Sequence, residues 1–168
     1  RDATMAFDDK MPQLNQDAFH QSDWNESIYG DVEEELPPKM PKPRGNPVMM
    51  TCFVDANHAG DKLTRRSQTG FIIYLNNSPI DWYSKKQSTV ETAAYGSEFS
   101  SAKTAIQQIQ GLRTTLRYLG VPVDDTSYMF GDNGSVVTSS TMPDSQLNRR
   151  HLALSYHYVR EAIASGMV

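Results

Sequence analysis

The chain has 168 residues, of which 38% are apolar, and its mean hydropathy is −0.56. This size suits one globular domain with an extension, and no apolar run approaches the roughly 20 residues of a membrane-spanning helix, which excludes a membrane protein of that kind. A single cysteine excludes an internal disulfide framework and a cysteine-based zinc cluster, and it favours a reducing intracellular compartment. Residues 1–50 carry five Lys or Arg against ten Asp or Glu, whereas the remainder carries a net charge of +1, so the acidity belongs to the N-terminal part.

Residues 1–47 are expected to form an acidic, proline-rich N-terminal arm or linker. Five of the nine prolines lie between Pro37 and Pro47, where missing amide hydrogens favour an extended course. Trp24 and Tyr29 stand among acidic residues, which leaves docking on a neighbouring surface and disorder as open alternatives. The chain begins with Arg1 and shows no signal-peptide pattern, so we expect a fragment or a processed product.

Three β-strands are predicted after the arm. Residues 48–56 form a short apolar run typical of a buried strand, and residues 70–75 and 79–86 read as two further strands joined by a hairpin turn.

The remainder alternates helix and strand. Apolar residues recur at spacings of three and four over residues 92–119, followed by Gly120 and Pro122, which predicts one long amphipathic helix. Residues 127–132 predict another strand, a short helix extends through residue 138, and a last helix covers residues 152–163. The predicted order is therefore β-β-β-α-β-α-α, an α/β fold with a mixed sheet flanked by helices.

Three carboxylates are the strongest candidates for chemistry. Asp55 lies within an apolar strand and Asp132 follows another, where desolvation of a carboxylate is costly unless a metal ion or donor is present. Glu98 shares a helix face with the small residues Ala102 and Ala105, which would let that face approach the sheet. Each also has an ordinary interpretation: Asp132 suits a helix N-cap, and Glu98 suits a solvated flank.

Their combination favours a metal site. If the two strands are neighbours and the helix packs over them, the three carboxylates converge on one point. Clustered carboxylates commonly bind hard divalent cations such as Mg²⁺, and a pair of such ions supports hydrolysis of a phosphodiester.

Four motifs carry a resemblance to a known family. They are FVDANHAGDKLTRRSQTGFIIYL, WYSKKQSTVETAAYGSEF, FGDNGSVV and NRRHLALSYHYVREAIASG, in this order along residues 48–168. Together they resemble the ribonuclease H domain of copia-type retrotransposon polyproteins. The resemblance implies a ribonuclease H-like domain over residues 48–168, preceded by a connection from reverse transcriptase.

The resemblance implies hydrolysis of the RNA strand of RNA·DNA hybrids by two Mg²⁺ ions, with Mn²⁺ as the alternative metal. The family holds the ions with three Asp and one Glu, and Asp55, Glu98 and Asp132 match the first three as catalytic and metal-binding residues. The fourth Asp lies on a helix after one more strand, so we expect a C-terminally truncated domain with weak or no activity. Its open sheet edge would then need the arm or a protein partner to cover it.

Basic and polar residues predict a nucleic-acid contact beside these acids. The candidates are Arg65, Arg66, Lys85, Lys86, Gln87 and Ser88. Lys and Arg position a phosphate backbone, although a solvated surface is the ordinary interpretation of such groups. His58 is a weaker candidate in a turn sequence, and Trp82 and Tyr83 are expected in the core.

Two other functions remain open at this level. The first is a retroelement-derived piece that keeps the fold as a catalytically silent structural or interaction subunit. The second is an integrase-like transferase that uses Asp55, Asp132 and Glu161 in place of Glu98.

Overall fold

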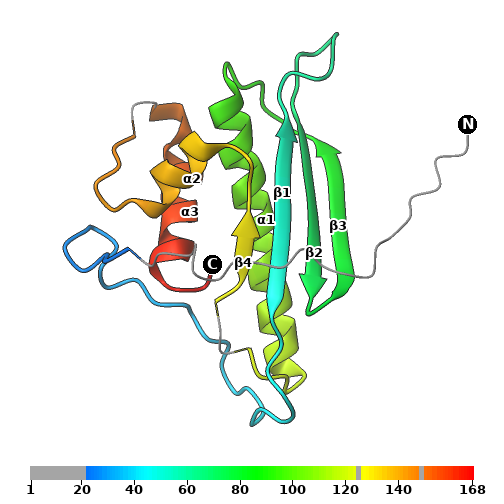
Figure 1. Ribbon diagram of the computed structural model, residues 1–168, viewed down its shortest axis with the longest axis vertical. Helices are drawn as coiled ribbons and strands as arrows, with labels where there is room; N and C mark the ends of the chain where they lie inside the picture. Colours follow the sequence, from blue (N-terminus) through cyan, green and yellow to red (C-terminus); the bar gives the residue numbers. More distant parts are fainter. Residues whose placement is uncertain (1–21, 124–125, 148–149) are drawn as a thin grey trace, which may run out of the picture.

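The computed structural model describes residues 22–123, 126–147 and 150–168. In this part of the chain a four-stranded mixed sheet has one long helix packed on it, and two further helices pack against that helix (Figure 1). Residues 1–21 of the expected arm lie outside the described residues. The predicted α/β class with a mixed sheet is confirmed, and it is consistent with a ribonuclease H-like fold.

The sheet has the strand order β3-β2-β1-β4. The strands β1 (Met50–Asn57), β2 (Gln68–Leu75) and β3 (Ser78–Lys86) form an antiparallel meander, as predicted. The short strand β4 (Tyr128–Phe130) pairs parallel with β1, and Phe53 lies opposite Phe130. This parallel pairing makes the ends of β1 and β4 point the same way.

The helices follow the predicted order. The long helix α1 covers Ala94–Tyr118 and is followed by Gly120, whose positive φ of 75° suits glycine. The helix α2 covers Gly134–Thr141, a 3₁₀ turn η2 covers Arg150–Leu152, and α3 covers Ala153–Ala164. At 1.5 Å per residue, α1 is about 37 Å long and runs along the full length of the strands (Figure 1).

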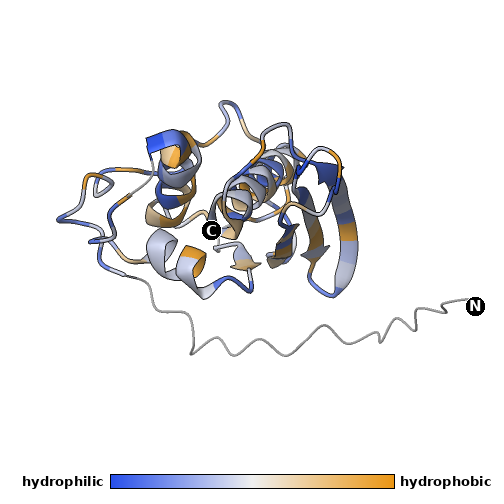
Figure 2. Ribbon diagram, turned by 90° about the horizontal axis from the view of Figure 1, so that it is seen from above, coloured by the Kyte–Doolittle hydropathy of each residue, from blue (hydrophilic) through white to orange (hydrophobic). Residues whose placement is uncertain are grey.

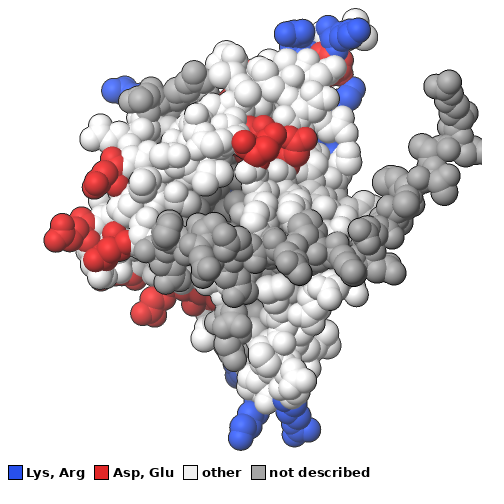
Figure 3. All heavy atoms as spheres, viewed as in Figure 1, with Lys and Arg blue, Asp and Glu red and all other residues white. Residues whose placement is uncertain are grey.

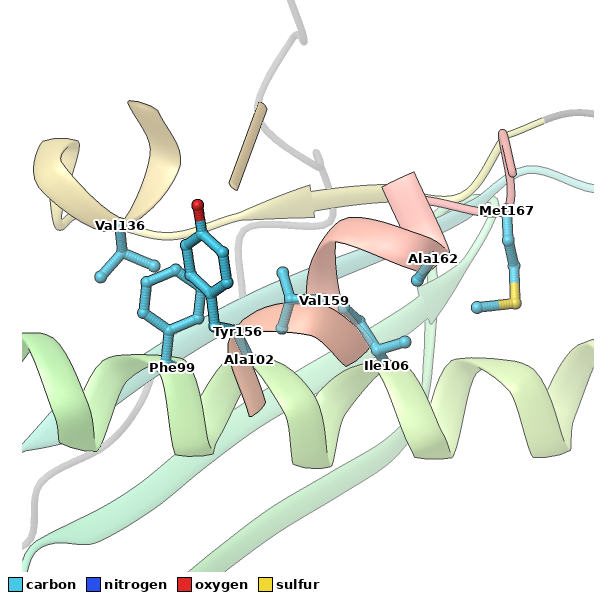
Figure 4. Packing of buried hydrophobic residues seen from close by; sticks show 8 residues of the cluster. All are labelled: Phe99, Ala102, Ile106, Val136, Tyr156, Val159, Ala162 and Met167. Carbon is cyan, nitrogen blue, oxygen red and sulfur yellow. The ribbon is translucent and has the colours of Figure 1, made fainter. Parts of the chain in front are cut away.

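Two apolar faces of α1 build the core. Ala105 and Ile109 pack on the sheet residues Met50, Cys52, Val54, Phe71 and Ile73. Phe99, Ala102 and Ile106 face α2 and α3 instead, as Figure 4 shows: Val136, Tyr156, Val159, Ala162 and Met167 complete this cluster. Seen from above, α1 lies over one face of the sheet, and α2 and α3 lie to the side of it (Figure 2). The helix position of Glu98 therefore depends on packing from two directions.

The described part of the arm docks on α3 through a buried cation. Arg160 is 2% exposed, and its guanidinium lies 4.8 Å from the Trp24 ring centroid and 5.2 Å from that of Tyr29. The same group donates hydrogen bonds to the carbonyls of residues 139, 142 and 143. Arg160 therefore holds both arm residues 24–29 and the loop between α2 and α3 in place.

Two further observations concern the surface. Trp82 is 73% exposed, so its predicted core position is wrong: it lies on the edge strand β3, opposite Ile72, on the face away from α1. Tyr83 points to the other face and stacks on Phe71, with ring centroids 5.0 Å apart.

Among the described residues, no helix combines the length and apolar character that a membrane span requires.

Candidate metal centre

The two aspartates lie on neighbouring segments, Asp55 on β1 and Asp132 just beyond the end of β4. Asp55 is two residues beyond Phe53 on β1, and Asp132 is two residues beyond Phe130, which pairs with Phe53. Since adjacent strands lie about 4.8 Å apart, this register alone brings the two carboxylates together. Asp132 is not the N-cap of α2, because Asn133 fills that position and accepts a hydrogen bond from the Val136 amide. Asp132 is thus left exposed for another role.

Glu98 reaches the same point from the helix layer. It lies in the second turn of α1, between the fully buried Ser97 and Phe99. Phe99 packs among the residues of α2 and α3, which fixes the rotation of this turn. The Glu98 side chain is half-buried, whereas Asp55 and Asp132 are exposed.

The three carboxylates meet at one end of the sheet. One ligand oxygen from each of Asp55, Glu98 and Asp132 lies within 4.8 Å of the other two. Within the described residues, no Lys, Arg or His forms an ion pair with any of them. Figure 3 shows acidic side chains gathered on the face that carries this end of the sheet.

The pKa of Glu98 records this crowding. Burial, followed by the negative charges of Asp132 and Asp55, raises the pKa of Glu98 from 4.5 to about 7. The three carboxylates therefore repel one another, and this repulsion destabilises the fold when no metal cation is bound. Three carboxylate oxygens at this spacing could hold a hard divalent cation.

The predicted basic residues lie on the loop after β1 and at the end of β3. Arg65 and Arg66 are exposed on the loop between β1 and β2, and Asp61 of the same loop accepts a 2.6 Å hydrogen bond from Lys86 on β3. This contact, with two backbone amides, holds the pKa of Asp61 below its usual range. Figure 3 shows basic side chains around the tip of this loop.

The strand register places β3 relative to the centre. Lys85 pairs with Thr69, which pairs with Ala56, the residue after Asp55. Lys85 thus lies two strands away, about 10 Å at the usual strand spacing. Ser88, two residues after the strand, is exposed as well.

Gln87 differs from its neighbours because its side chain is buried. It is 7% exposed, and its amide nitrogen contacts the Ser97 carbonyl at 2.8 Å. His58 is half-buried, with its Nδ1 3.3 Å from the hydroxyl of Ser97. The sequence pattern does not predict these internal contacts; the only signal is a polar stretch at residues 87–89, a few residues before α1.

Glu161, the alternative third ligand, is exposed on α3 and is absent from the one acidic group of the described residues that could hold a metal ion. The geometry therefore joins Asp55 and Asp132 with Glu98.

Several known proteins with similar sequences are transposon polyproteins. The chain is 30% identical over 123 residues to the retrovirus-related Pol polyproteins from transposons RE2 and RE1 of Arabidopsis thaliana, a match that covers 73% of this chain and 8% of each relative. It is 25% identical over 119 residues to the retrovirus-related Pol polyprotein from transposon TNT 1-94 of Nicotiana tabacum, with 71% of this chain and 9% of that relative covered. No family model matches the chain. The chain matches less than a tenth of the length of each of these Pol polyproteins.

Proposed function

We propose that the chain is a retroelement-derived ribonuclease H domain that hydrolyses the RNA strand of RNA·DNA hybrids with two divalent cations, Mg²⁺ or Mn²⁺. The observation that carries the proposal is the meeting of Asp55, Glu98 and Asp132 within 4.8 Å at the end of the sheet. Homology to transposon Pol polyproteins supports a retroelement origin.

In this proposal the three carboxylates hold the cations. When bound, a pair of divalent ions activates a water and stabilises the leaving oxygen of a phosphodiester. The exposed Asp55 and Asp132 present their oxygens to solvent, where a phosphate can approach, and the half-buried Glu98 closes the centre from the helix side.

The hybrid contact is proposed for Arg65, Arg66, Lys85, Lys86 and Ser88, which are exposed on the loop after β1 and around the end of β3. The positive charges of Arg65, Arg66, Lys85 and Lys86 neutralise phosphates, so hybrid binding should weaken with salt. A hybrid duplex would be recognised by its shape and 2′-hydroxyl groups more than by its base sequence.

Cleavage by the chain as printed is proposed to be weak. Four carboxylates hold the ions in the family that the motifs resemble, and the described residues bring three together. A three-carboxylate centre binds cations with fewer ligands and less negative charge, so metal affinity is the more sensitive measurement.

The decisive test measures Mg²⁺ binding by isothermal titration calorimetry and hybrid cleavage with Mg²⁺ or Mn²⁺. We expect Asp55→Asn and Glu98→Gln to weaken Mg²⁺ binding at least tenfold and to remove any cleavage. Glu161→Gln is the matched control on α3 and should change neither. Loss of activity with Glu161→Gln alone would favour the integrase-like alternative and overturn the assignment of Glu98.

The catalytically silent alternative is separated by the same experiment. A wild-type chain that folds but binds neither Mg²⁺ nor Mn²⁺ would contradict the proposed nuclease and leave a structural or interaction subunit. Covering of the sheet edge by a protein partner remains a prediction of that alternative.

A further inference from the structure

We propose that Gln87 is a positioning residue for the carboxylate centre: its buried side-chain amide fixes the first turns of α1 against β2, and so holds Glu98 opposite Asp55. The inference rests on the proposed function and assigns Gln87 a role other than the phosphate contact expected from the sequence.

The amide nitrogen of Gln87 joins three groups. It lies 2.8 Å from the carbonyl oxygen of Ser97, 3.1 Å from the hydroxyl of Thr69 and 3.2 Å from the hydroxyl of Ser101. The two hydroxyls also contact each other at 2.9 Å. Each of these four residues is less than a tenth exposed, so water does not compete strongly for the contacts.

These contacts lie one residue from the carboxylates on both sides. Ser97 directly precedes Glu98 on α1. Thr69 pairs with Ala56 on β1, and the next pair along the strands is Asp55 with Gly70. A shift of Gln87 would therefore move the turn that carries Glu98 relative to the strand that carries Asp55.

The loop after β1 is tied to the same residues. The backbone amide of Gln87 donates to the Ser67 carbonyl at 2.8 Å, and the Ser67 hydroxyl accepts from the Ala59 amide at 3.1 Å. His58, three residues after Asp55, contacts the Ser97 hydroxyl through Nδ1. Both the strand and the helix of the metal centre thus meet in one buried polar network around Gln87.

The network is not the arrangement that stability alone would favour. The side-chain carbonyl oxygen of Gln87 is buried without a hydrogen-bond partner among the described residues, which is unfavourable. An apolar side chain of similar length would avoid that cost. The amide nitrogen is also fully used inside the fold, so it has no hydrogen left for a phosphate.

The test compares Gln87→Met with wild type and with Gln108→Met. Methionine keeps the length of the side chain and removes the donor. Gln108 lies on α1, about 15 Å along the helix from Glu98, and its side-chain amide donates to Asp81 at 2.6 Å. It is therefore a matched control remote from Glu98. The measurements are Mg²⁺ affinity by calorimetry, kcat and KM for an RNA·DNA hybrid, and amide hydrogen exchange of the metal-free protein.

We expect Gln87→Met to weaken Mg²⁺ binding about tenfold or more and to lower kcat, with KM changed less than twofold. Amide exchange over residues 97–101 should quicken, while Gln108→Met leaves all four quantities unchanged. If Gln87→Met fails to fold, Ser101→Ala removes one contact of the same amide and is read in the same way.

A raised KM with unaltered Mg²⁺ affinity would overturn the inference and make Gln87 a hybrid contact. Unaltered affinity, kinetics and exchange would overturn it as well. If the wild type neither binds Mg²⁺ nor cleaves the hybrid, the proposed function fails, and amide exchange alone decides whether Gln87 fixes the first turns of α1.

Discussion

The two ends of α1 hold carboxylates in opposite electrostatic settings. Near the N-terminus, Glu98 faces Asp55 and Asp132, and its pKa is raised to about 7. Near the C-terminus, Glu34 of the arm lies between the guanidinium groups of Arg113 and Arg117, each donating two hydrogen bonds of 2.6–2.8 Å to it. Burial alone would raise the pKa of Glu34, but the two arginines outweigh it and lower the pKa to about 2.

The difference separates a group that stabilises the fold from one that is costly to it. Glu34 joins the arm to the helix, and Arg113 extends the contact to the Ser127 hydroxyl at 2.9 Å. Among residues 22–123, 126–147 and 150–168 no such cation pairs with the carboxylates around Glu98, so their charges oppose folding until a metal cation binds. A carboxylate kept in an unfavourable place is a better functional candidate than one in a satisfied ion pair.

The largest expected effect comes from breaking the arm contact. Glu34→Gln removes the negative charge that pairs with the buried Arg113, whose side chain is 3% exposed, and with Arg117. Loss of one member of a buried ion pair should lower the free energy of unfolding by about 3 kcal/mol. Urea denaturation measures this, with exposed Glu35→Gln as the control. Equal stability of the two variants would show that the arm adds little.

The same pair should respond to acid. The pKa of Glu34 is depressed in the folded state, so its stabilisation is present above pH 4.5 and is lost as the pH falls towards 2. The stability difference between wild type and Glu34→Gln should shrink by about 2 kcal/mol over this window. Denaturation curves at several pH values check it, and a difference that stays constant would contradict the ion pair as its source.

Much of this arrangement was predictable from local patterns. The long helix follows from apolar spacing, because Ile106 and Ile109 are both fully buried on its inner faces. The meeting of the three carboxylates followed from two strand ends and a small-residue helix face, although their catalytic role stays a prediction. These signals work because each depends on the periodicity of one element.

Contacts between distant segments were not predictable in this way. Glu34 and Arg113 are 79 residues apart, and only the four-residue spacing of Arg113 and Arg117 marks a common helix face. Trp82 was misplaced because composition does not tell which strand is the sheet edge. The sequence predicts a phosphate contact for Gln87, whereas its side chain is buried. That burial depends on how α1 approaches β2, which local sequence patterns do not show.

The smallest expected effect concerns the other end of α1. In the folded state without metal the pKa of Glu98 is raised, so between pH 4.5 and 7 the folded protein binds more protons than the unfolded one, and stability falls as the pH rises. Glu98→Gln removes this charge and should stabilise the protein at pH 8 by about 1 kcal/mol, a figure reduced for partial exposure.

Below pH 4 the wild type and Glu98→Gln should be equally stable, because Glu98 of the wild type is then largely protonated in both the folded and the unfolded state. Thermal unfolding in a chelator measures the difference, with Glu161→Gln as the surface control. Mg²⁺ at ten times its dissociation constant should raise the stability of the wild type by about 1.4 kcal/mol at pH 8 and have less effect on Glu98→Gln. A variant that is less stable than wild type at pH 8 without metal would show that Glu98 contributes to the fold as Glu34 does, and the contrast between the two ends of α1 would fail.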